Sequence, residues 1–214
     1  HLAQNTTIVS HQGGCRLSMR LFLMLLLLSE TVDRESLRFA YSTEQGFDTS
    51  CGLTALSCLM DRYWGVPSDE VSLARDFLAE KIVGGDFTVS FADMAAILKA
   101  KGFSCRAYQM TFGQLEKAVA RYAPVIVHYD KPEGHFALVL AVRDGSVLTA
   151  DPAEGTISRE KAAFESLWSG NVMLAALPGR SVNLELVEEA KKSVWGRGEL
   201  LERAALAGAG VTGW

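Results

Sequence analysis

The spacing of apolar residues predicts that the first part of the chain is helical. Apolar side chains recur at helical intervals over residues 51–63, which is typical of an amphipathic helix. Thr49 and Ser50 precede this stretch and can cap the helix. We therefore expect Cys51 to be its first residue.

Two further helices are expected before residue 103. Ser68 can cap a helix over residues 70–78, and Ser90 and Asp93 have the spacing of a capping box. The helix that follows this box should end at Gly102, because glycine readily adopts the left-handed conformation that closes many helices.

Beyond Gly102 the pattern changes from helical spacing to short, strand-like runs. Asp144 and Gly145 lie between two of these runs and are typical of a tight β-hairpin. Helices followed by an antiparallel sheet predict an α+β domain over about residues 38–178. The predicted strands cover residues 103–110, 125–129, 135–142, 146–150 and 172–177, and the predicted helices cover residues 111–122 and 158–168.

Residues 179–214 are predicted to form a helical C-terminal extension. Helix-forming residues recur at helical spacing over residues 182–206, interrupted by Gly196 and Gly198. This extension either packs against the domain or binds a partner, and the sequence leaves both alternatives open.

Residues 1–37 form an N-terminal segment with the features of a secretory signal over about residues 16–29. Arg16 and Arg20 precede a run of eight apolar residues, 21–28, as in a signal peptide. A run of this length is too short to cross a bilayer as a helix. We therefore expect export and a periplasmic location. A helix packed on the domain and an uncleaved anchor that associates with a membrane are the alternatives.

Composition narrows the classes of function. Hydrophobic residues make up 49% of the 214 positions, which is enough for one domain core. The 21 basic and 25 acidic residues are interspersed, so the charge pattern predicts no nucleic-acid partner. The four cysteines form no C-x-x-C pair, and with four histidines they show no zinc-ligand spacing. We predict mostly free thiols and no metal or cofactor; the oligomeric state stays open.

Cys51 is the first candidate for chemistry. A thiol reacts as its thiolate, and the N-terminus of a helix stabilises an anion through its unpaired N–H groups and dipole. Gly52 follows and would let a substrate approach without a side chain in the way. Cysteine in this setting is, however, more often a buried structural thiol. A functional Cys51 should lie in a groove lined by a general base.

His135 and Asp151 lie at the two ends of one predicted hairpin. His135 opens a strand directly after a turn, where its imidazole can face a cleft as a general base. The returning strand brings Asp151 back towards the level of His135, so that the carboxylate can reach the imidazole ring. Taken singly, the histidine could be structural and the aspartate a turn former.

These residues together resemble a known family. The stretches 44–56 (EQGFDTSCGLTAL) and 134–139 (GHFALV), with the Asp-Pro pair at 151–152, are similar to the bacteriocin-processing cysteine peptidases. Those enzymes cut leader peptides after a double glycine and are often fused to an exporting transporter. The resemblance covers about residues 38–178. It implies a papain-like fold with N-terminal helices packed on an antiparallel sheet.

The resemblance also implies a role for each site residue. Cys51 would be the nucleophile, His135 the general base, and Asp151, sixteen positions after His135, the orienting group. Gln45, six positions before Cys51, would donate a hydrogen bond to the oxyanion. Ser50 stands where the family usually has an aspartate, which removes a polar contact but no member of the triad.

The setting resembles a stand-alone peptidase rather than a transporter. In this sequence no membrane spans or nucleotide-binding domain follow the predicted domain. This organisation resembles that of the peptidase component of bacterial functional-amyloid secretion systems. A protein or peptide substrate is then expected, such as an exported fibre or a secretion-system component. We predict a cysteine endopeptidase. The alternatives are a catalytically silent module that guides an export substrate, and another papain-like acyl transfer such as amidase or transglutaminase activity.

Three remaining residues attract weaker interpretations. Cys58 and Cys105 are interpreted as small buried apolar groups. His128 lies within a predicted strand and is interpreted as a core or sheet-face histidine, with a second catalytic histidine as the alternative.

Overall fold

A computed structural model describes residues 37–47, 49–86, 88–131 and 133–209, with side chains described up to residue 196. The signal expected at residues 16–29 lies outside the described residues. Within the part of the chain that is described, no helix is long and apolar enough to span a membrane.

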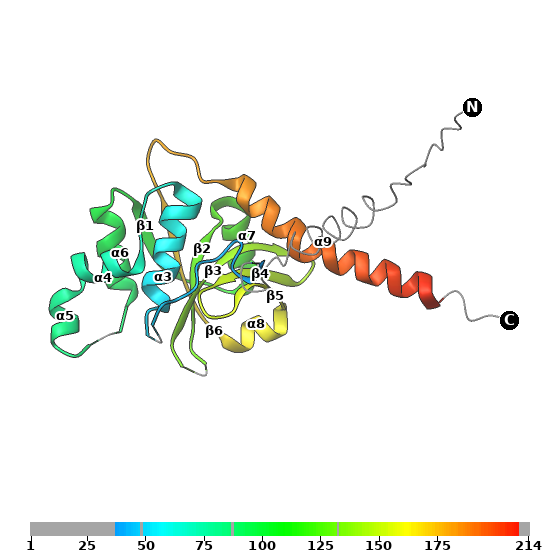
Figure 1. The fold of residues 1–214 in the computed structure, drawn as a ribbon, viewed down its shortest axis with the longest axis horizontal. Helices are drawn as coiled ribbons and strands as arrows, with labels where there is room; N and C mark the ends of the chain where they lie inside the picture. The colour runs from blue at the N-terminus through cyan, green and yellow to red at the C-terminus, as the bar shows by residue number, and fades with distance from the viewer. Residues whose placement is uncertain (1–36, 48, 87, 132, 210–214) are drawn as a thin grey trace, which may run out of the picture. The chain divides into compact units, whose positions relative to one another are not determined.

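Six antiparallel strands form one sheet, in the order β1-β6-β2-β3-β4-β5. This sheet and the helices around it confirm the predicted α+β fold (Figure 1). The strands are β1 (Ser104–Gln109), β2 (Val125–Tyr129), β3 (His135–Arg143), β4 (Ser146–Asp151), β5 (Gly155–Glu160) and β6 (Trp168–Ala176).

Helices cover both faces of the sheet. α3 and α6 share one buried cluster with the sheet, and α7 and α8 share the other. The helical elements are α3 (Cys51–Cys58), the π-helical η1 (Leu59–Tyr63), α4 (Glu70–Phe77), α5 (Ala79–Val83), α6 (Phe91–Ala100), α7 (Phe112–Tyr122), α8 (Lys161–Leu167) and α9 (Leu184–Ala209).

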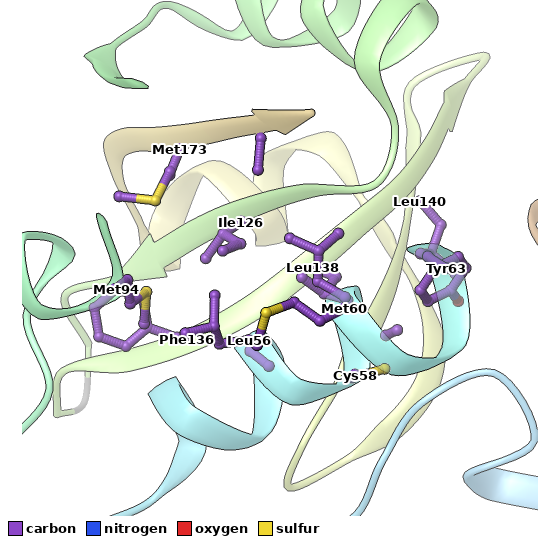
Figure 2. Close-up of a cluster of buried hydrophobic side chains, with 14 of the residues drawn as sticks. Leu56, Cys58, Met60, Tyr63, Met94, Ile126, Phe136, Leu138, Leu140 and Met173 are labelled. Atoms are coloured by element: carbon purple, nitrogen blue, oxygen red, sulfur yellow. The ribbon is translucent and has the colours of Figure 1, made fainter. Parts of the chain in front are cut away.

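The strands alternate their side chains between these two clusters, as a pleated strand must. On one face, Leu56 and Met60 pack in the same cluster as Leu138 of β3 (Figure 2). On the other face, Val139 packs in the cluster that contains Leu115 of α7. The sheet is therefore buried on both sides in its centre, and functional groups can reach solvent only near the strand ends.

A β-bulge in β3 decides whether His135 shares a face of the sheet with Asp151. Near the hairpin turn Ala141 pairs with Leu148, but the register shifts before Val139, which pairs with Thr149. Leu140 and Ala141 consequently face the same cluster. Leu138 then pairs with Ala150, and Asp151 comes level with residue 137 instead of residue 138. The bulge thereby puts His135 and residue 137 on the face that Asp151 occupies.

Several of the predicted helix ends are confirmed. Ser90 and Asp93 form the expected capping box at the start of α6, and Gly102 follows that helix with a left-handed φ of 86°. The hairpin turn is also present, with positive φ values at Asp144 and Gly145.

The predicted caps of two other helices are wrong. Ser50 occupies the N-cap position of α3, but its hydroxyl donates to the Phe47 carbonyl at 2.7 Å and makes no cap bond. The helix after residue 68 is capped by Asp69, whose carboxylate accepts from the Ser72 N–H at 2.8 Å. Asp69 is one residue nearer the helix, where its side chain reaches the first turn.

The helix predicted over residues 158–168 begins too early. Residues up to 160 belong to β5, and α8 starts at Lys161. Pairing with β4, in which Thr149 lies opposite Ile157, completes the sheet at this edge. Tertiary pairing overrides a local pattern that is compatible with either structure.

The first part of α9 packs on the domain. Val187 and Ala190 are buried in the same cluster as α3. The Trp195 indole N–H donates to the Ser158 hydroxyl at 2.9 Å, and the Arg143 guanidinium lies 4.5 Å from the centre of the Trp195 ring. Over these residues the extension therefore packs against the domain, which is one of the two alternatives that the sequence left open.

We predict that Gly52→Ala destabilises the protein by about 1–3 kcal/mol, because the added methyl group overpacks the site. A Cβ at Gly52 would lie 2.9 Å from both Val89 Cβ and Met94 Cε. Urea unfolding measures the change. Gly113→Ala is the matched control, since a Cβ there meets nothing within 4 Å and alanine should stabilise the helix by about 0.5–1 kcal/mol. Equal effects of the two substitutions would contradict this packing.

Candidate active site

Cys51 lies at the N-terminus of α3 and lines a cleft of about 650 Å³ together with His135 and Asp151. The Cys51 side chain is near enough to His135 to raise the pKa of the imidazole. Only 8% of the residue is exposed. The expected groove lined by a base is present, and Cys51 is largely buried within it.

His135 and Asp151 are diagonal neighbours on one face of the β3–β4 pair, which is the position that the bulge creates. The His135 Nε2 lies 2.9 Å from Asp151 Oδ1. A carboxylate only accepts hydrogen bonds, so Nε2–H donates and Nδ1 is left for the thiol. The His135 imidazole therefore connects the Asp151 carboxylate to the cleft that Cys51 also lines.

Asp151 is held on several sides. It is almost fully buried, with 1% exposed, and Oδ1 also accepts from the Ala153 N–H at 2.9 Å and the Glu154 N–H at 3.1 Å. Burial raises the pKa of Asp151, but hydrogen bonds and charge attraction from His135 and these two N–H groups outweigh it, so the pKa is lowered. The carboxylate stays ionised and can orient the imidazole.

The protonated form of His135 is strongly favoured. Burial lowers its pKa, but the hydrogen bonds and attraction from Asp151 and Cys51 dominate and raise the pKa to about 10. The Asp151 carboxylate thus favours an imidazolium beside Cys51.

Tyr129 is a member of the site that sequence reasoning missed. Its ring stacks on His135 with centroids 5.9 Å apart and planes inclined by 22°, and Arg159 lies over the tyrosine ring at 5.7 Å. Tyr129 pairs directly with His135 across β2 and β3. An assumed antiparallel pairing of these two strands would have identified it.

Gln45 lies beside the Asp151 turn rather than in the cleft lining. Its backbone N–H donates to the Pro152 carbonyl at 3.0 Å. The side-chain Oε1 is buried and has no hydrogen-bond partner among the described residues. The structure therefore places Gln45 next to the turn that carries Asp151.

His128 lines the cleft wall on β2. Its Nδ1 lies 3.2 Å from the Ser169 hydroxyl and 3.4 Å from Asp130 Oδ1, and its ring packs on Phe136 with centroids 4.9 Å apart. Burial lowers the pKa of His128, and the positive charge of His135 adds to this. These contacts fit the sheet-face interpretation of His128.

The remaining described cysteines are free thiols. Cys58 is buried, and burial raises its pKa to about 11. Cys105 is only partly buried, so the interpretation of a buried group is wrong for it. Its thiol lies at the edge strand β1, 3.7 Å from the Ala95 carbonyl. The described residues contain no group of three metal-ligating side chains.

The fold defines the class of protein, which is that of the papain-like cysteine peptidases. A family model described as "Peptidase C39 family" matches residues 40–178. The chain therefore belongs to the Peptidase C39 family, and its enzyme class is cysteine peptidase.

Solved structures of peptidase domains share this fold. The peptidase domain of Streptococcus ComA, a bifunctional ABC transporter involved in quorum sensing, has a TM-score of 0.55 at 19% identity, covering 63% of this chain and 96% of that domain. A double glycine motif protease from an AMS/PCAT transporter, solved in complex with the leader peptide, has a TM-score of 0.52 at 15% identity, covering 65% of this chain and 90% of that one. These likenesses support the papain-like fold.

Curated relatives match over the same domain. "Probable functional amyloid protease FapD" of Pseudomonas aeruginosa is 28% identical over 137 residues, which cover 63% of this chain and 60% of the relative. An uncharacterized protein of Methanothermobacter marburgensis is 29% identical over 129 residues, covering 58% of this chain and 80% of the relative. The match thus spans less than two thirds of the FapD protein.

We predict that the free energy of unfolding falls as the pH rises from about 6.5 to about 10, the ordinary and the folded pKa of His135. A raised pKa means that the folded protein holds this proton more tightly, so the stabilisation is complete below the lower value and is lost through the higher one. Urea titrations across this range measure the effect. Asp151→Asn should flatten the dependence, because the main partner of the imidazolium loses its charge. The same slope in both proteins would contradict the pairing.

Proposed function

We propose that the protein is an endopeptidase that cuts its substrate through a thioester on Cys51. The observation that carries this proposal is that Cys51, His135 and Asp151 line one cleft, with His135 Nε2 2.9 Å from Asp151 Oδ1. These three residues supply a nucleophile, a base and an orienting group, which are the parts that nucleophilic acyl transfer requires.

The chemistry follows from the positions of these groups. The Cys51 sulfur attacks the carbonyl carbon of the scissile bond, and a tetrahedral oxyanion forms. His135 then gives its proton to the leaving amine nitrogen, the C–N bond breaks, and a thioester remains. His135 next takes a proton from water, which attacks the thioester carbonyl; the C–S bond then breaks, the carboxylic acid product leaves, and the Cys51 thiolate and protonated His135 are restored. Asp151 keeps the ring in one orientation throughout.

The oxyanion needs donors near the start of α3. The backbone N–H of Cys51 belongs to the first turn, where helical N–H groups have no partner within the helix. Gln45 would add a side-chain N–H₂, and its anchorage to Pro152 keeps it beside the Asp151 turn. This role requires that the Gln45 N–H₂ group reach the oxyanion when the substrate binds.

The substrate is proposed to be an exported protein or peptide. An open cleft of about 650 Å³ accommodates a peptide segment of a few residues and is lined by residues from α3, β2, β3 and β5. The relative named for functional amyloid and the leader-peptide complex of a double glycine protease support substrates of this kind. Action in the periplasm, on a fibre or secretion-system component, belongs to the same proposal.

We predict that Cys51→Ala and His135→Ala each lower cleavage by at least about 10³-fold, because the triad members act as one unit. The assay incubates the purified protein with the proteins encoded beside its gene and identifies new chain termini by mass spectrometry. Cys105→Ala, at a partly buried thiol outside the cleft lining, is the control and should cleave normally. Unchanged cleavage by Cys51→Ala would disprove the mechanism. Specific binding without cleavage by the wild type would favour a silent guiding module.

We further predict that Gln45→Ala lowers kcat by about 10²–10³-fold, the usual effect of removing one oxyanion donor. KM should change little, because the oxyanion exists only in the transition state and intermediate. Steady-state kinetics on the cleaved substrate separate the two constants. A normal kcat would assign oxyanion binding to backbone groups alone.

A further inference from the structure

The segment at residues 38–45, which we call the N-terminal strap, lies against the turn that carries Asp151. Its Ser42 hydroxyl donates to the Asp151 carbonyl at 2.8 Å, and the Gln45 N–H donates to the Pro152 carbonyl. The strap is in turn held by η1, because the Arg62 guanidinium donates to three strap carbonyls and the Tyr63 hydroxyl donates to a fourth. These carbonyls belong to Phe39, Ala40, Ser42 and Tyr41.

Arg38 of the strap binds this turn through two side-chain hydrogen bonds. Its Nη2 donates to the Ala153 carbonyl at 2.6 Å and its Nε donates to the Glu154 carbonyl at 2.7 Å. The peptide group between Ala153 and Glu154 is thus bound at both ends: its oxygen by Arg38, and its N–H by the Asp151 carboxylate at 3.1 Å. Hydrogen bonds arranged in series polarise and strengthen each other.

Gly155 permits this close approach. It has a φ of 82°, and a Cβ at this position would lie 2.4 Å from the Arg38 carbonyl oxygen. Only glycine adopts this backbone conformation without strain and leaves room for the strap. The turn and the strap are therefore fitted to each other at the position of Arg38.

We propose that Arg38 is a positioning residue for the active site, which fixes the turn after β4 so that two backbone N–H groups hold the Asp151 carboxylate against His135. This inference rests on the proposed function for its catalytic consequence, but its structural content does not. The side chain of Arg38 is exposed and does not touch the cleft. It acts only through the turn.

The ionisation of His135 reports the position of Asp151. Four residues are near the imidazole: Cys51 from α3, His128 and Tyr129 from β2, and Asp151 from β4. Two further charged residues, Arg159 of β5 and Glu154, are near Tyr129. A looser Asp151 turn weakens the attraction of the carboxylate for the imidazolium, which lowers the pKa of His135. Loss of the Arg38 charge alone would have the opposite sign, because it removes a cation near the imidazolium.

The experiment is an NMR titration of His135 in proteins that carry Cys51→Ala, so that no cleavage occurs. Arg38→Lys keeps the positive charge but cannot bind two carbonyls in one plane, and Arg38→Gln also removes the charge. Both should lower the pKa of His135 by about one unit relative to Cys51→Ala alone. Arg180→Gln is the matched control, since Arg180 is also exposed and donates to a distant carbonyl, that of Gly65, at 3.1 Å.

Two results would overturn the proposal. The first is an unchanged pKa of His135 in both Arg38 variants. The second is a raised pKa of His135 in Arg38→Gln with no change in Arg38→Lys, because this would be an effect of the Arg38 charge alone. Arg38→Lys keeps the test available if Arg38→Gln does not fold. In the active protein, Arg38→Lys should lower kcat about ten-fold or more, with KM nearly unchanged, because the base is misplaced. A wild-type protein that cuts nothing would refute the proposed function, whereas the titration would still decide the role of Arg38.

Discussion

The contact between His135 and Asp151 depends on the bulge in β3. Without it, regular alternation along β3 from Ala141 would point His135 towards the α3 cluster, on the opposite face of the sheet from Asp151. Because one extra residue at Leu140 shifts the register, His135 comes onto the face of Asp151 and the two side chains meet at 2.9 Å. An irregularity in the sheet thus produces the regular geometry of the site.

The rest of the site is assembled around this pair from separate parts of the chain. α3 brings the Cys51 thiol to the other side of the imidazole, and its first turn packs tightly against Val89 through Gly52. The N-terminal strap holds the turn after β4 from outside. Helix α3, the sheet and the N-terminal strap therefore position Cys51, His135 and Asp151 from different parts of the chain, and such support from rigid elements is the preorganisation that catalysis needs.

Much of this arrangement is predictable from local patterns. A helix beginning at Cys51 and a hairpin that starts at His135 and returns to Asp151 are visible in the periodicity and in the Asp144–Gly145 turn. The resemblance to C39 peptidases added Gln45, which the structure places beside the triad but outside the cleft lining.

Other features leave no local pattern. The bulge lies in the uniformly apolar run 136–142, where either register would bury hydrophobic residues, so periodicity cannot reveal it. The last residues of β5, 158–160, fall in the predicted helix over residues 158–168, because only pairing with β4 makes them part of a strand. Arg38 acts on carbonyls more than 100 residues away, at separations of 115 and 116 positions. Because the partners of Arg38 are backbone carbonyls, which every residue has, no particular side chain marks this contact in the sequence.

Competitive thiol labelling tests most directly whether the residues around Cys51 make it an activated nucleophile. The protein is treated with a limiting amount of a thiol-directed electrophile at neutral pH, and peptide mass spectrometry gives the rate at each cysteine. Cys105 is more exposed than Cys51, so accessibility alone would make Cys105 react first. The triad predicts that Cys51 reacts much faster than Cys105 and Cys58, and that urea removes the difference. Slow labelling of Cys51, at or below the rate of Cys105, would contradict the account.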